Sequence, residues 1–117
     1  GLSARKVSYL KDLASHAQRW SVAQWQQHSD EELIAQLTAV RGIGRWTAEM
    51  FLIFHLLRPD VWPADDLGLR RALVRYYGMA QEAPRAVWCA AGERYRPWRT
   101  VATWYLWRAL DPVVVAY

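Results

Sequence analysis

The chain has 117 residues, of which 53% are hydrophobic and 22% charged. This composition suits one small folded domain and excludes a disordered chain. Fifteen Lys and Arg against eleven Asp and Glu give a net charge of +4, an excess that suits a polyanionic partner without requiring one. A single cysteine, Cys89, excludes an internal disulfide and any four-cysteine zinc or iron–sulfur site, and we expect a cytoplasmic setting.

No apolar run approaches ~18 residues, so no membrane span is expected. The first residues lack an initiator Met and a signal peptide's apolar stretch, and they lead straight into a helix. We therefore expect that the N-terminal portion of a longer protein has been removed. Eight Trp residues exceed what a small core needs, so we expect most of them in the core and some facing a ligand.

Two helices are predicted in the first 39 residues. Ser3 is a good N-cap for an amphipathic helix that reaches about Gln18. A polar stretch follows at 21–28, with Trp20 and Trp25 as packing anchors. Ser29 and Glu32 have the spacing of a capping box, which predicts a helix over 30–39. The apolar positions expected to face inward on the first helix are Val7, Leu10, Leu13, Ala14 and Ala17.

The stretch 37–47 reads Leu-Thr-Ala-Val-Arg-Gly-Ile-Gly-Arg-Trp-Thr. Gly42 and Gly44 allow a tight hairpin with positive φ between the helix that ends near Ala39 and one that starts at Arg45. Amides at the start of that second helix point outward, where a phosphate can bind. The pattern therefore indicates a helix-hairpin-helix. An ordinary turn between helices with a glycine C-cap is the alternative.

The helix predicted over 45–57 is apolar nearly all round, so we expect it to be central and buried, with His55 as a core histidine satisfied by a neighbour. An extended connector at 61–64 leads to Asp65 and Asp66. Either aspartate can cap the helix predicted over 67–77, which Gly78 ends.

Two more helices complete the chain, one from Pro84 to about residue 95 and one over 98–110 after Pro97. The only strand-like run is the tail 113–115, so the predicted fold is all-α: a helical bundle of about five to six helices containing a helix-hairpin-helix motif. We expect a single domain over 1–117, with the hairpin at 37–48 and a functional loop at 61–67. The faces predicted for the later helices are Leu69, Leu73, Tyr76 and Tyr77 inward with Arg70, Arg71 and Arg75 outward, then Trp98, Val101, Ala102 and Tyr105 on one stripe with Trp104 and Trp107 on another.

A helix-hairpin-helix followed some twenty residues later by Pro-x-Asp-Asp at a helix start resembles the helix-hairpin-helix DNA glycosylase superfamily, and within it the 3-methyladenine DNA glycosylase II branch. The matching stretches are 1–6 (Gly-Leu-Ser-x-x-Lys), 37–48, 63–66 and 96–100 (Arg-Pro-Trp-Arg-Thr). The resemblance implies the C-terminal part of that fold. It also implies base excision, in which a damaged nucleotide is flipped out and its N-glycosidic bond is cut.

The family's catalytic carboxylate falls on Asp66, where it would stabilise an oxocarbenium-like sugar or orient water. Asp65 would be its structural partner. The alternative is that both aspartates only cap the helix. Strand-nicking members carry a lysine where this chain has Trp46, so the resemblance implies a monofunctional glycosylase that leaves an abasic site. Trp46 would stack on a cationic alkylated purine; a plain core residue is its alternative.

The resemblance also places Trp107 in the base pocket, with Trp104 as the alternative register. Leu67 stands where the branch often carries an aromatic, so the preferred lesion stays open. The expected phosphate contacts come from Gly42, Gly44, Arg45 and Thr47, and they are sequence-independent and salt-sensitive. Main-chain carbonyls of Thr38, Val40 and Ile43 would hold a monovalent cation, Na⁺ or K⁺. No other cofactor is implied.

Double-stranded DNA with a damaged base is the implied partner, in a cytoplasmic, nucleoid-associated setting of the bacterial type. Two other readings stay open: a helix-hairpin-helix module that binds DNA without cutting it, or an inactive fragment; and a glycosylase for a different lesion. We also expect self-association through the face that missing N-terminal helices would leave open.

Overall fold

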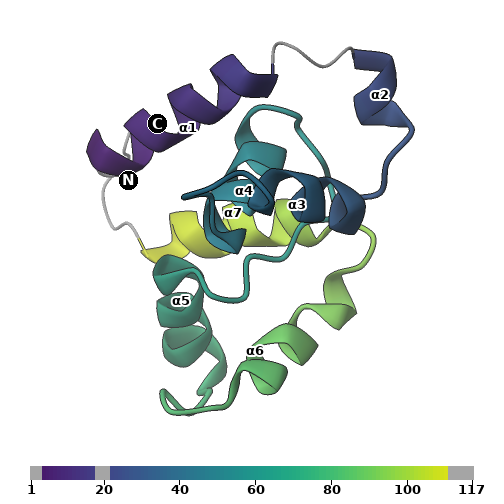
Figure 1. Ribbon diagram of the computed structural model, residues 1–117. Coiled ribbons are helices and arrows are strands. Elements are labelled where there is room, and N and C mark those ends of the chain that lie inside the picture. The colour runs from purple at the N-terminus through teal and green to yellow at the C-terminus, as the bar shows by residue number, and fades with distance from the viewer. Residues whose placement is uncertain (1–3, 18–21, 111–117) are drawn as a thin grey trace. The chain divides into compact units, whose positions relative to one another are not determined.

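The computed structural model describes residues 4–17 and 22–110. Its contacts divide the chain into two compact units, Gly1–Arg58 and Pro59–Tyr117, and each is described by itself. Every regular element in the described residues is helical (Figure 1), which confirms the all-α prediction. They form seven α-helices and one 3₁₀ turn, more than the five to six expected. The single domain over 1–117 stays a prediction.

The first unit contains four helices: α1 (Ala4–Ala17), α2 (Val22–Gln26), α3 (Asp30–Thr38) and α4 (Arg45–Phe54). Helix α4 packs against both α1 and α3, as its apolar sequence predicted. Helix α2 was not predicted, because five residues are too few to show a periodic pattern. The N-cap Ser3 and the anchor Trp20 lie outside the described residues. The buried apolar side chains of this unit are Trp25, Leu33, Ile34, Leu37, Ala48, Met50, Phe51, Leu52 and Ile53.

The capping box at the start of α3 is confirmed. The hydroxyl of Ser29 accepts from the Glu32 amide at 3.2 Å, and the Glu32 carboxylate accepts from the Ser29 amide at 3.4 Å. Hydrogen bonds from His28 and then from Ser29 lower the pKa of Glu32 below its usual value. The cap fixes where α3 begins, and α3 in turn sets the position of the hairpin that follows it.

Helix α4 ends at Phe54, three residues earlier than predicted. Leu57 adopts φ +54° and is 77% exposed, and the Arg58 amide folds back onto the Leu52 carbonyl at 2.9 Å. The prediction of a core histidine at His55 is wrong: this residue is the C-cap of α4, exposed, with its ring stacked on Phe51 at 4.8 Å. The left-handed turn ends the helix before its apolar pattern ends.

The second unit contains α5 (Leu67–Tyr77), α6 (Arg85–Ala91), the 3₁₀ turn η1 (Glu93–Tyr95) and α7 (Arg99–Leu110). Helix α5 packs against α7. The Trp62 indole donates to the Trp88 carbonyl at 2.9 Å, and Gly92 passes so close to it that an added Cβ would lie 2.5 Å from the ring. The core of this unit consists of Trp62, Ala64, Leu69, Ala72, Leu73, Trp88 and Leu106.

The bounds of α5 agree with the prediction, and Gly78 ends it with φ +65°. Pro84 is the N-cap of α6 rather than its first residue, and α7 begins at Arg99. There the Asp60 carboxylate accepts from the Arg99 amide at 3.1 Å and from its guanidinium at 2.8 Å. Partial burial acts to raise the pKa of Asp60, but the hydrogen bonds from Arg99 bring it below its usual value.

The predicted inner faces of α5 and α7 are partly wrong. Tyr76 and Tyr77 are exposed, and Ala72 takes the inner position instead. Trp98 and Tyr105 are 59% and 71% exposed, whereas α7 buries Thr100, Thr103 and Leu106. Size and hydrophobicity misled the prediction, because α7 buries two threonines and Leu106 in place of these larger aromatic side chains. The second unit therefore carries an exposed aromatic face formed by Tyr77, Trp98, Val101 and Tyr105.

No helix among the described residues is long and apolar enough to cross a membrane.

Self-association through the face that missing N-terminal helices would leave open stays a prediction, and the exposed aromatic face of the second unit is an apolar surface on which it can be tested. Sedimentation equilibrium should show a concentration-dependent dimer that Trp98→Ser weakens at least about threefold, since the serine removes a large apolar contact. Leu57→Ser, which removes an even more exposed apolar side chain from the first unit, is the matched control. A monomer at every concentration contradicts the prediction.

Candidate functional site

The hairpin between α3 and α4 has the geometry expected from its glycines. Gly42 has φ +88°, and Gly44 is the N-cap of α4 with extended backbone. The Ile43 amide donates to the Val40 carbonyl at 3.1 Å and closes the turn. An added Cβ on either glycine would meet nothing within 4 Å. Both glycines therefore present bare backbone on the surface.

Backbone donors are available at this hairpin. The bond from the Ala48 amide to the Gly44 carbonyl, at 3.1 Å, begins the hydrogen-bond ladder of α4, and Gly44 offers no side chain as a cap. Among the described residues no acceptor takes the amide protons of Gly44 and Thr47. Such donors at the positive end of a helix suit an anion.

The two larger side chains at the start of α4 both have partners within the first unit. The Arg45 guanidinium forms ion pairs with Glu31 at 2.7 Å and with Glu49 at 3.4 Å. Trp46 is half-buried, and the Lys6 ammonium lies 4.3 Å from the centre of its ring. The ring of Trp46 thus already holds one cation, the type of contact proposed for an alkylated base.

The carbonyls predicted to hold a cation lie in the same turn. Val40 accepts from the Ile43 amide, whereas no donor among the described residues reaches the carbonyls of Thr38 and Ile43. Oxygen ligands of this kind suit hard cations such as Na⁺ and K⁺. The residues present therefore fit such an ion.

Asp66 lies at the start of α5 in the second unit and is 9% exposed. One of its oxygens, Oδ2, accepts two hydrogen bonds of 2.8 Å, from the Leu69 amide and from the Trp107 indole. Asp66 is thus the N-cap, as one reading of the sequence allowed. Its carboxylate is also held from two helices in a fixed orientation.

Asp65 does not cap the helix but forms ion pairs with Arg70 at 3.1 Å and Arg85 at 3.0 Å. Arg70 also donates to the Ala64 carbonyl at 2.7 Å and lies 5.0 Å from the ring centre of Trp88. The prediction that Arg70 points outward with Arg71 and Arg75 is therefore wrong. It instead holds the loop that leads to Asp66.

Trp107 and Gly68 complete the surroundings of Asp66. A Cβ on Gly68 would lie 3.2 Å from Asp66 Oδ2 and 3.3 Å from the Trp107 ring, so glycine leaves room for the hydrogen bond. Trp104 packs edge-on against Trp107 at 5.5 Å, and Leu67 beside them is 67% exposed. Sequence reasoning missed the bond from Trp107 to Asp66, because no local pattern links residues 41 positions apart. The one local feature related to this bond is the glycine at position 68, two residues after Asp66, where a side chain would crowd the Trp107 ring.

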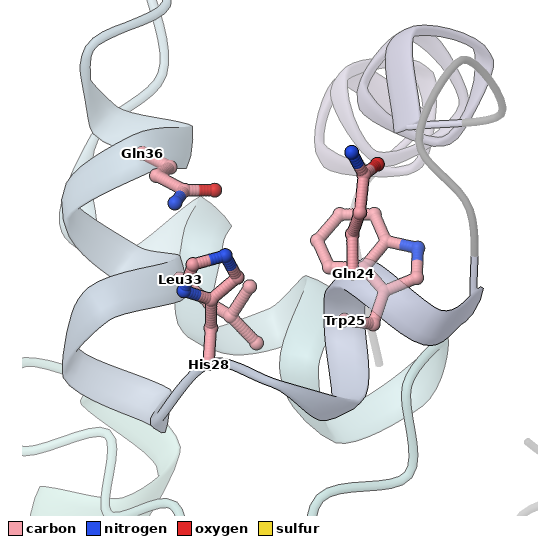
Figure 2. Close-up of a pocket in the computed structure, with 5 residues that line it drawn as sticks. All are labelled: Gln24, Trp25, His28, Leu33 and Gln36. Carbon is pink, nitrogen blue, oxygen red and sulfur yellow. The ribbon is translucent and has the colours of Figure 1, made fainter.

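Figure 2 shows a small pocket on α2 and α3 in the first unit. His28, Leu33 and Gln36 line it together with Gln24 and Trp25. None of the predicted site residues belongs to this pocket.

No protein-family model matches the chain. DNA-3-methyladenine glycosylase 1 of Schizosaccharomyces pombe is 43% identical over 112 residues, which are 92% of this chain and 49% of that protein. A solved structure of 3-methyladenine DNA glycosylase from the same organism, in complex with abasic DNA, superposes with a TM-score of 0.72 at 37% identity, covering 99% of this chain and 58% of that chain. The chain is homologous to the DNA-3-methyladenine glycosylases. The sequence resemblance is thereby confirmed.

Other glycosylases show the same relationship. DNA-3-methyladenine glycosylase 2 of Escherichia coli is 28% identical over 107 residues, covering 92% of this chain and 36% of that protein. The structure of DNA-3-methyladenine glycosidase from Bacillus halodurans has a TM-score of 0.72 at 34% identity, over 96% of this chain and 52% of that chain. The chain spans about half the length of the first of these glycosylase relatives. That this half is the C-terminal one stays a prediction.

Removing the indole donor of Trp107 tests its bond to Asp66. Trp107→Phe keeps an aromatic ring but leaves the carboxylate with one donor fewer, so the free energy of unfolding should fall by about 1–3 kcal/mol in urea denaturation. A double-mutant cycle with Asp66→Ala should show coupling of similar size. Strictly additive effects would contradict the bond.

Proposed function

We propose that this chain forms part of a monofunctional DNA glycosylase that removes alkylated purines of the 3-methyladenine type in base excision repair. The observation that carries the proposal is Asp66, a buried carboxylate held in place at a helix start, in a chain 43% identical to a DNA-3-methyladenine glycosylase. The hairpin some twenty residues upstream supports the proposal independently, because its Gly44 and Thr47 amides are available to bind a phosphate.

Asp66 supplies the chemistry in this proposal. When the bond between C1′ of the sugar and the purine nitrogen breaks, its electron pair leaves with the base and C1′ becomes positively charged. A carboxylate beside the sugar stabilises that charge, and water adds to C1′ with loss of a proton. The Leu69 amide and the Trp107 indole hold the carboxylate before the reaction begins, so it need not reorganise.

Trp46 limits this proposal to hydrolysis. An indole cannot form a Schiff base with the sugar, so the product is an abasic site in an unbroken strand. We also propose that Trp46, Leu67 and Trp107 line the base pocket. A positively charged purine would be attracted to the Trp46 ring in the way that Lys6 is, at 4.3 Å from its centre.

The proposed partner is double-stranded DNA containing a damaged base, and the solved relative bound to abasic DNA supports it. The Gly44 and Thr47 amides, with Gly42 and Arg45 beside them, would contact phosphates without reading sequence. Such contacts weaken as salt rises, because binding releases counterions from DNA. A cytoplasmic, nucleoid-associated setting belongs to the same proposal.

A helix-hairpin-helix module that binds DNA without cutting it is the second candidate. One observation favours this candidate: the chain spans only 49% of the length of a glycosylase relative to which it is 43% identical, so part of that relative has no counterpart in the chain. Duplex binding with no base release by the wild-type chain would support this candidate over the glycosylase.

Asp66→Asn tests the catalytic role. Single-turnover release of 3-methyladenine from methylated DNA should slow by at least about a hundredfold, because the amide cannot neutralise the charged sugar. Glu82→Gln, an exposed acid on the loop before α6, is the matched control and should keep the wild-type rate. Equal rates for wild type and Asp66→Asn would contradict the role, and strand cleavage by the wild type would contradict the monofunctional assignment.

We further propose that the carbonyls of Thr38, Val40 and Ile43 hold Na⁺ or K⁺ at the hairpin. Replacing K⁺ by a large organic cation at constant ionic strength should then weaken duplex binding severalfold in a fluorescence anisotropy titration. Gly42→Ala strains the turn that aligns these carbonyls, since its φ is +88°, and should abolish the difference between the two cations. Equal affinity of the wild type in both salts would contradict the site.

A further inference from the structure

Arg45, the first residue of α4, lies between two carboxylates. Glu31 accepts two hydrogen bonds from its terminal nitrogens, at 2.7 and 3.1 Å, in the fork geometry that arginine also offers to phosphate. On the other side Glu49 faces Arg45 Nε at 3.4 Å. The two acids differ in environment: the Glu31 side chain is 72% exposed and that of Glu49 is 2% exposed.

This difference assigns the two acids different roles. Glu49 is one turn along α4 from Arg45 and is buried, so breaking its ion pair would leave a carboxylate buried without compensation. Glu31 comes from the first turn of α3 and faces solvent, where an ion pair contributes little to stability. Arg45 Nε therefore faces a carboxylate that burial keeps in place, although the two make an ion pair rather than a hydrogen bond. The partner of the terminal nitrogens is a solvent-exposed side chain that another anion can replace.

The charges around Arg45 indicate which kind of group can replace Glu31 on its terminal nitrogens. The three side chains together carry a net charge of −1, directly beside the Gly44 and Thr47 amides that are open to an anion. A cation at the positive end of a helix is itself unfavourable, and in the free protein the two acids compensate it. A second anion that approaches the hairpin competes with Glu31 for the same nitrogens.

We propose that Glu31 occupies, in the free protein, the position that a DNA phosphate takes on the terminal nitrogens of Arg45, and that buried Glu49 is the positioning residue that aims this fork. The inference rests on the proposed function, since it concerns the same hairpin. DNA binding then exchanges one carboxylate for one phosphate, with Arg45 already oriented and its Nε contact unchanged.

The test is anisotropy titration of a fluorescein-labelled duplex at two salt concentrations. Glu31→Gln should tighten binding about three- to tenfold at low salt, since it removes the competing charge. Glu82→Gln makes the same change in net charge at an exposed position of the other unit and should change affinity less than twofold. In an Arg45→Gln background, Glu31→Gln should lose its effect, because the fork for which it competes is gone.

Glu49→Gln tests the positioning role. It should weaken binding and lower the slope of log affinity against log salt by about one, because one arginine–phosphate contact is lost. Glu49→Asp should restore part of the affinity, which a purely structural defect would not. If Glu49→Gln fails to fold, the Glu31 and Arg45 cycle still decides the exchange.

The outcomes separate the two proposals. Absence of duplex binding by the wild-type chain contradicts the proposed function. Duplex binding that Glu31→Gln and Glu82→Gln strengthen equally, or a gain that persists without Arg45, overturns the exchange while leaving the proposed function intact.

Discussion

One carboxylate oxygen joins two helices of the second unit at the candidate site. Asp66 Oδ2 accepts from the first turn of α5 and from an indole near the end of α7, so it connects two helices that pack together. The Gly68 backbone leaves the space that this arrangement needs. Asp65, the residue before Asp66, is held by ion pairs with Arg70 and Arg85. The orientation of Asp66 is therefore determined by contacts on several sides, which is the condition for a preorganised catalytic group.

Acidic side chains in both units serve mainly to hold arginines. Asp60 binds Arg99, Asp65 binds Arg70 and Arg85, and Glu31 and Glu49 bind Arg45. A net charge of +4 therefore does not amount to a row of available guanidinium groups. In the proposed function, phosphate contacts therefore fall first to main-chain amides, which carry no counter-charge to displace. For that proposal the bare glycine backbone at the hairpin matters more than the excess of basic residues.

The sequence predicted best what is decided locally. The capping box at Ser29, the hairpin glycines and the bounds of α5 each follow from a few neighbouring residues. It predicted poorly what tertiary packing decides. The end of α4 depends on a left-handed turn at Leu57, and the inner face of α7 contains two threonines in place of aromatic residues. The role of Arg70 depends on a loop that its side chain folds back to hold. The bond from Trp107 to Asp66 lies beyond any local pattern. The roles assigned to Asp66 and Trp46 stay predictions that came from the family resemblance. The phosphate-binding role of the hairpin stays a prediction that came from its glycines and from the helix start that follows them.

The structure also shows that the two interpretations of Asp66 are compatible. A carboxylate at Asp66 was read either as a helix cap or as a catalytic group, as if one excluded the other. The capping bond from the Leu69 amide and a second bond from the Trp107 indole both end on Oδ2, and together they fix the position of the carboxylate. A residue required to stabilise a cation at one defined place needs a fixed position. Capping supplies that position, so the structural role of Asp66 is part of what makes the proposed chemical role feasible.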